Sequence, residues 1–219
     1  MKLFRKKKEL KHIHWGDITI AQHKKILDLC KDGDDDIMYL YQLTAIAYNK
    51  PMEWIEGMKI SEANNYANTL AFINEKPKPK TAKGYYTLNG HRYKTTMNLQ
   101  EVNTAQYLDF QQLADKSREM PAEFLSIILI PEGKKYNEGY DLQTVVSDIE
   151  NYMTVEEAFG LTAFFFNLLQ ISMRLSLRKL KRLERKARKE GLMTNEQLEA
   201  LSKVRESLES ASGMRQWMQ

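Results

Sequence analysis

The residues that could bind a metal ion do not form a recognisable ligand set. The acidic run at residues 32–36 (Asp-Gly-Asp-Asp-Asp) invites a calcium interpretation. An EF-hand loop beginning at Asp32 would need a bidentate Glu at its twelfth position, where this chain has Leu43. We therefore interpret the run as helix capping and solvation. No metal site and no cofactor is predicted.

The residues for acid–base or nucleophilic chemistry also lack their usual partners. A doublet such as Glu156 and Glu157 suits the first turn of a helix, where the dipole favours negative charge. His12 and His14 alternate beside basic residues, and His23 and His91 have no nearby carboxylate or cysteine pair that suggests a metal site, so all four histidines are interpreted as surface residues. Cys30 is expected to be a buried or inert thiol in an amphipathic helix.

The motifs that mark phosphate loops, dinucleotide-binding turns, zinc proteases and serine hydrolases do not occur in this sequence. A single cysteine excludes an intrachain disulfide framework. The basic start has no apolar stretch of the signal-peptide type, so export is not expected. These observations predict a protein that is not an enzyme.

The formal net charge of +4 is the sum of basic and acidic segments that differ strongly in charge. Residues 1–11 carry a charge of +5 and residues 174–190 carry +7, whereas residues 12–173 carry −7 and residues 191–219 carry −1. An acidic body therefore has two basic segments. Clusters of this kind attract nucleic acid, anionic membranes or acidic protein surfaces, and salt weakens the attraction.

The basic segment near the C-terminus is the main candidate site. On a helix its cations follow one side at steps of three and four residues, where like charges oppose the helix that carries them. A solvated face is one interpretation, and an anionic partner bound through phosphates or carboxylates is the other. The predicted binding residues are Arg174, Arg178, Lys179, Lys181, Arg182, Arg185, Lys186, Arg188 and Lys189.

A long helix must position these cations. The periodic pattern predicts one helix over 155–190, started by a Thr154/Glu157 capping box and about 54 Å long. Its first half is almost wholly apolar and is predicted to form a protein interface. In its second half one apolar stripe is expected, followed by a final helix begun at Thr194. The predicted interface residues are Phe164, Phe165, Leu168 and Leu169, and the predicted stripe is Met173, Leu177, Leu180, Leu183 and Ala187.

The apolar half raises the alternative of membrane insertion. Only 16 residues separate Glu157 from Arg174, fewer than the roughly 20 that a spanning helix needs. Asn167 and Gln170 also interrupt the run. A core helix or an oligomer interface is the preferred interpretation, and a membrane partner is not expected.

The rest of the chain is predicted to consist of short helices and one β-hairpin. Asn89-Gly90 between two tyrosine-containing runs indicates a type I′ turn, with Tyr86 opposite Tyr93. The fold class is therefore mainly α: clusters of short helices, one small β-hairpin, and a long C-terminal helix followed by a helical hairpin. The predicted divisions are a basic arm at 1–14, a short-helix module at 15–75, a Lys/Pro linker at 76–84, a hairpin with helices at 85–153, and the long basic helix and helical hairpin at 154–219.

Several segments within about residues 15–170 resemble small assembly or virion proteins of tailed bacteriophages, especially those of the crAss-like type. They are Ile18–Gln22, the Asn89-Gly90 turn, 106–110 (Gln-Tyr-Leu-Asp-Phe), 127–136 (Ile-Ile-Leu-Ile-Pro-Glu-Gly-Lys-Lys-Tyr) and 163–166 (Ala-Phe-Phe-Phe). The resemblance implies a non-enzymatic protein of head, head–tail connector or tail assembly. The basic extension after Met173 does not match a tail-assembly chaperone, which favours a virion component near packaged DNA.

The partners and the location of the protein are predicted from the same observations. We expect contacts with other phage structural proteins, a homo-oligomer, non-specific contact with DNA, and a location in the virion or the host cytoplasm. The alternative is a nucleic-acid-binding regulator that uses the basic helix and the N-terminal arm.

Overall fold

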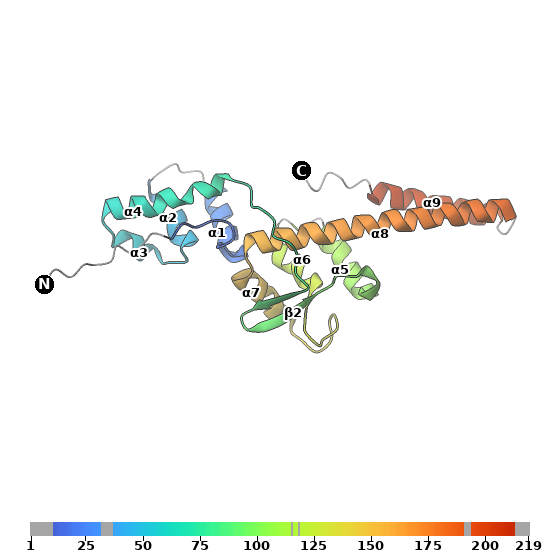
Figure 1. Cartoon of the computed structure of the whole chain (residues 1–219), viewed down its shortest axis with the longest axis horizontal. Coiled ribbons are helices and arrows are strands. Elements are labelled where there is room, and N and C mark those ends of the chain that lie inside the picture. Colours follow the sequence, from blue (N-terminus) through green and yellow to red (C-terminus); the bar gives the residue numbers. More distant parts are fainter. Residues whose placement is uncertain (1–10, 32–36, 115, 118, 191–193, 213–219) are drawn as a thin grey trace. The chain divides into compact units, whose positions relative to one another are not determined.

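The computed structural model describes residues 11–31, 37–114, 116–117, 119–190 and 194–212 (Figure 1). It confirms the predicted fold class, because the described part is mainly helical with a small antiparallel sheet and a long helix near the C-terminus. In chain order the elements are α1 (Ile20–Lys31), α2 (Ile37–Ala47), α3 (Met52–Glu56), α4 (Ile60–Ala67), η1 (Asn68–Asn74), β1 (Tyr85–Leu88), β2 (His91–Thr95), η2 (Leu99–Glu101), α5 (Thr104–Ala114), α6 (Pro121–Ile128), β3 (Leu129–Pro131), α7 (Leu142–Tyr152), α8 (Val155–Glu190) and α9 (Asn195–Ser212).

The chain forms two compact units. The first contains residues 1–96 and 102–162, and the second contains residues 97–101 and 163–219. The predicted linker at 76–84 lies within the first unit. Helix α8 is continuous from Val155 to Glu190, as the periodic pattern predicts, and its first two turns belong to the first unit.

Helix α1 begins at a capping box, as predicted. The backbone N–H of Thr19 donates to Gln22 Oε1 (2.9 Å), and the N–H of Gln22 donates to Thr19 Oγ1 (3.3 Å). The buried Gln22 amide also donates to the carbonyl of Ile46 at the end of α2 (2.8 Å). The acidic run expected to cap α2 lies outside the described residues, so its capping and calcium interpretations stay predictions.

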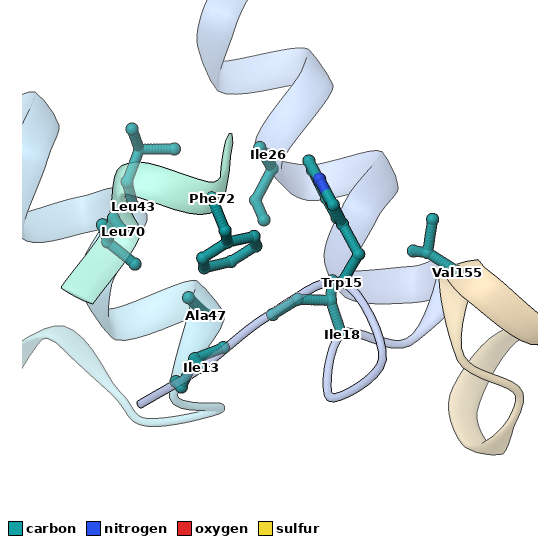
Figure 2. Packing of buried hydrophobic residues seen from close by; sticks show 9 residues of the cluster. All are labelled: Ile13, Trp15, Ile18, Ile26, Leu43, Ala47, Leu70, Phe72 and Val155. Atoms are coloured by element: carbon teal, nitrogen blue, oxygen red, sulfur yellow. The ribbon is translucent and has the colours of Figure 1, made fainter. Parts of the chain in front are cut away.

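One buried cluster joins the short helices to the start of α8 (Figure 2). Trp15 packs edge-to-face on Phe72, with ring centroids 5.1 Å apart, and its indole N–H donates to the carbonyl of Glu75 (2.7 Å). Burying large apolar side chains is the main favourable term in folding, and the indole hydrogen bond removes the cost of a buried polar group. The cluster comprises Ile13, Trp15, Ile18, Ile26, Leu43, Ala47, Leu70, Phe72 and Val155.

The first turn of α8 is tied to the segment before α1. Thr19 and Thr154 form an antiparallel bridge, in which the N–H of Val155 donates to the carbonyl of Ile18 (2.8 Å) and the N–H of Ile20 donates to that of Met153 (3.2 Å). At the predicted Thr154/Glu157 capping box, the N–H of Glu157 donates to Thr154 Oγ1 (3.4 Å). The start of α8 is thus fixed by both local and long-range hydrogen bonds.

The β-hairpin has the predicted turn and register. Asn89 and Gly90 have φ angles of 51° and 78°, and Tyr86 pairs with Tyr93. From sequence, a helix is expected to begin at Pro121 and to continue through Ile130, where Pro131 stops it. This is wrong at its end, because α6 ends at Ile128 and residues 129–131 form a third strand on β2. A buried apolar run fits a helix or a strand equally well, and the neighbouring β2 edge decides the outcome.

The Lys/Pro segment after η1 runs against the start of α8. The N–H of Lys80 donates to the carbonyl of Glu156 (2.9 Å), and the ammonium group of Lys83 pairs with Glu157 (2.8 Å). A Cβ atom at Gly160 would collide with the backbone carbonyl of Lys80. Glycine is therefore required at this position for the extended segment to reach the helix.

We predict that Gly160→Ala lowers the free energy of unfolding by about 1–3 kcal/mol, because the added methyl group must displace backbone atoms. Urea unfolding followed by tryptophan fluorescence, to which buried Trp15 contributes, measures the change. Gly84→Ala is the matched control, since a Cβ atom there meets nothing within 4 Å. Equal stability of the two variants would show that the Lys80 segment can leave the helix without cost.

Candidate functional site

The cations of α8 lie together on its exposed surface. Arg174, Arg178 and Arg185 are exposed. The neighbouring basic side chains that the structure describes are also exposed: Lys179, Lys181, Arg182, Lys186 and Lys189. Lys181 also has an interaction within the protein. The side chain of Arg188 lies outside the described ones. We call the exposed set the cationic face; it comprises Arg174, Arg178, Lys179, Lys181, Arg182, Arg185, Lys186 and Lys189.

The opposite side of the same helical turns is buried. Leu177 and Ala187 are buried and Leu180 is half-buried, at spacings of three and seven residues that place them on one side of the helix. Helix α9 belongs to the same compact unit (Figure 1). Its start has the predicted capping box, in which the N–H of Thr194 donates to the side-chain oxygen of Gln197 (3.0 Å).

The predicted apolar stripe of this half is wrong at one position. Leu183 is 51% exposed, and the buried place next to it belongs to Glu184. The 3.6-residue period explains the error, because position 184 lies one heptad after Leu177, whereas position 183 is turned about 100° further round the helix. The side chain of Met173, also predicted in the stripe, lies outside the described ones.

The four predicted interface residues do not share one environment. Phe165 is buried, whereas Phe164, Leu168 and Leu169 are half-buried. Two later apolar side chains are more open: Ile171 is 54% exposed and Leu175 is 57% exposed. Sequence reasoning did not select them, although they continue the line of Phe164 and Leu168 at three- and four-residue spacing.

By length and composition, residues 155–187 of α8 could span a membrane, with a mean hydropathy of 1.3 in the most apolar window. The longest part of this stretch without a charged residue is the 16 residues between Glu157 and Arg174. Core helices of soluble proteins have the same composition. Val155, Ala158 and Leu161 of this helix are buried within the first compact unit.

A buried carboxylate is the polar cluster that sequence reasoning missed. Asp148 on α7 is 3% exposed; its Oδ1 accepts from the Asn89 amide (3.0 Å), and its Oδ2 accepts from the Tyr93 hydroxyl (2.6 Å). His91 Nδ1 lies 2.6 Å from the same Oδ2, although the two residues are far apart in sequence, and the His91 side chain is exposed, as predicted. An available signal was a charged residue among the apolar positions Val145 and Ile149 of an amphipathic helix.

The protonation of this cluster follows from its contacts. Burial opposes ionisation of Asp148, but the hydrogen bonds from Tyr93, His91 and Asn89 outweigh it and hold the pKa of the carboxyl below its usual value. Burial, together with the bond to this carboxylate, raises the pKa of the Tyr93 hydroxyl. Tyr93 is therefore not an activated nucleophile. The cluster holds the hairpin on α7.

Two segments that carry the resemblance to phage proteins contact each other. The buried Gln106 amide donates to the carbonyl of Ile127 (2.6 Å), and the Tyr136 hydroxyl donates to Asp109 Oδ2 (2.7 Å). Burial, followed by the bond to Asp109, raises the pKa of Tyr136. These motif residues attach α5 to the end of α6 and to the loop that contains Tyr136, so their role in the described structure is to stabilise the fold.

The remaining candidates are groups that could bind a metal ion and the thiol of Cys30 on α1. Among the residues that the structure describes, no three His, Cys, Asp or Glu side chains form a group that could hold a metal ion. Cys30 is exposed, contrary to a buried thiol, and accepts a hydrogen bond from the Tyr39 hydroxyl (3.0 Å).

Comparison with known proteins gives no relative: no protein-family model, no curated protein and no solved structure matches the chain. The resemblance to phage proteins therefore depends on the sequence motifs alone.

We predict that Asp148→Asn lowers the free energy of unfolding by about 1–3 kcal/mol at neutral pH, because buried donors lose a charged acceptor. Since folding lowers the pKa of Asp148, its contribution is complete above the unfolded pKa of about 3.9 and is lost as pH falls through the lower folded value. The difference between wild type and variant should therefore shrink below about pH 4.

Urea unfolding at several pH values measures this difference. Glu150→Gln is the control, because it removes a half-buried carboxylate from the same helix. A stability difference for Asp148→Asn that is the same at pH 3 and pH 7 would contradict a charged acceptor.

Proposed function

We propose that this chain is a non-enzymatic structural or assembly protein of a tailed bacteriophage, a head–tail connector, tail or internal virion component. It acts through protein–protein contacts and turns the cationic face of α8 toward DNA or an acidic neighbouring subunit. The exposure of the eight described cations over about four turns of one helix carries this proposal. In the cell it works in the host cytoplasm or in the virion.

The energetics of α8 support an anionic partner. Positive charges three and four residues apart destabilise a helix by roughly 0.2–0.5 kcal/mol per pair, and the cationic face contains several such pairs, beginning with Arg174 and Arg178. Bound phosphates or carboxylates would remove this repulsion. Arginine is suited to both, since its planar guanidinium group forms two parallel hydrogen bonds to either anion.

The second candidate is a nucleic-acid-binding regulator. Its support is the same cationic face together with the charge of +5 on residues 1–11. A regulator binds duplex DNA as an isolated protein with a steep salt dependence, whereas an assembly protein co-purifies with particles and binds DNA weakly alone. Mass spectrometry of purified virions and a salt titration with duplex DNA separate the two functions.

We predict that a variant with Arg178, Lys181, Arg182 and Arg185 all changed to Gln remains folded but loses its incorporation into particles. Binding to duplex DNA should weaken, and the slope of log K against log salt should fall by about 0.9 for each phosphate contact removed. Circular dichroism verifies the fold, and co-sedimentation with particles measures incorporation.

The control changes four exposed lysines outside α8, Lys24, Lys25, Lys76 and Lys78, to Gln and removes the same total charge. If both variants lose incorporation equally, net charge alone is responsible and the cationic face has no specific role. Unchanged incorporation of the α8 variant would remove the main support for the proposed function.

A further inference from the structure

One line of side chains along α8 is apolar over its first half and cationic over its second half. Its positions are separated alternately by four and three residues, the spacing of the contact positions in a coiled coil. We call this line the heptad stripe. Its members are Phe164, Leu168, Ile171 and Leu175, followed by Arg178, Arg182, Arg185 and Lys189.

The heptad stripe is accessible over most of its length. Ile171 and Leu175 are more than half exposed, and the four basic side chains are exposed. Phe164 and Leu168 are half-buried. The stripe lies on a different side of α8 from the buried residues Leu177 and Ala187.

The apolar half of the stripe argues against DNA as its partner. A helix that binds phosphates needs cations, and exposed Ile171 and Leu175 in line with them would gain little from a polyanionic backbone. Large apolar side chains at coiled-coil spacing gain most from the apolar side chains of a second helix.

The charge pattern argues against pairing of two copies along the whole stripe. In a parallel pair, Arg178, Arg182, Arg185 and Lys189 of one chain would face the same four cations of the other. In an antiparallel pair over the full stripe, these cations would face Phe164, Leu168, Ile171 and Leu175. The first arrangement is repulsive and the second buries charge against apolar groups.

We infer that the heptad stripe docks an α-helix of another protein whose own heptad positions are apolar over one half and acidic over the other. This inference deepens the proposed function, since it names the chemistry of the acidic neighbour. Each half of the stripe covers about 17 Å, enough for four contacts. Leu175 and its neighbours supply burial, and Arg178 and those after it bind carboxylates with paired hydrogen bonds.

Designed helical peptides test the inference on the full chain. The acidic peptide carries Leu at four consecutive heptad positions and Glu at the next four. One control replaces the four Glu by Lys, and another replaces the four Leu by Ser. We predict that the chain binds the acidic peptide more than about tenfold tighter than either control in isothermal titration calorimetry at physiological salt, because like charges and lost burial both oppose the controls.

Two variants make the prediction specific to the stripe. Arg178→Glu, Arg182→Glu, Arg185→Glu and Lys189→Glu combined should reverse the preference, so that the Lys peptide binds and the acidic peptide does not. Ile171→Gln with Leu175→Gln should weaken the acidic peptide by at least about tenfold while circular dichroism stays unchanged. If the fourfold variant does not fold, the single variant Arg182→Glu is used instead. It should weaken the acidic peptide and strengthen the Lys peptide.

Three results would overturn the inference. They are equal binding of the acidic and Lys peptides, tighter binding of duplex DNA that Ile171→Gln with Leu175→Gln does not weaken, and a dimer in light scattering that this variant dissolves. Loss of the inference leaves the proposed function intact if incorporation into particles still requires the cationic face. No binding of the acidic peptide, together with incorporation that does not depend on the cationic face, overturns the two together.

Discussion

Repulsion between like charges is the constraint that the second half of α8 must overcome. Cations at three- and four-residue spacing oppose a helix. The described structure offsets this with a buried side that includes Leu177 and Ala187, and with an apolar first half whose early turns are buried in the first compact unit. The second half of α8 therefore has a buried side and an exposed cationic face, and the cationic half of the heptad stripe is part of that face.

The features that sequence predicted are those decided locally. The Asn89-Gly90 turn, the capping boxes at Thr19 and Thr194, and the two ends of α8 depend on residues within a few positions of one another. Residue types at such spacing have strong conformational preferences, so one sequence is sufficient to find them.

The features that sequence missed depend on partners far along the chain. Strand β3 exists because β2 offers it an edge, and the Asp148 cluster brings together residues more than fifty positions apart. Glu184, not Leu183, lies on the buried side of α8, because small errors in the assumed helical period add up over several turns. The candidate site shows the same division: its cations were found from composition and spacing, whereas exposed Ile171 and Leu175 needed the structure.

The bridge between Thr19 and Thr154 has a consequence for synthesis. Val155 belongs to the same buried cluster as Ile13 and Trp15, so the ribosome must release more than 150 residues before that cluster can close. At roughly 5–20 residues per second, α1 and α2 wait several seconds with part of their apolar surface uncovered. During that interval the nascent chain is open to chaperones, and the cationic half of α8 emerges only as the cluster closes.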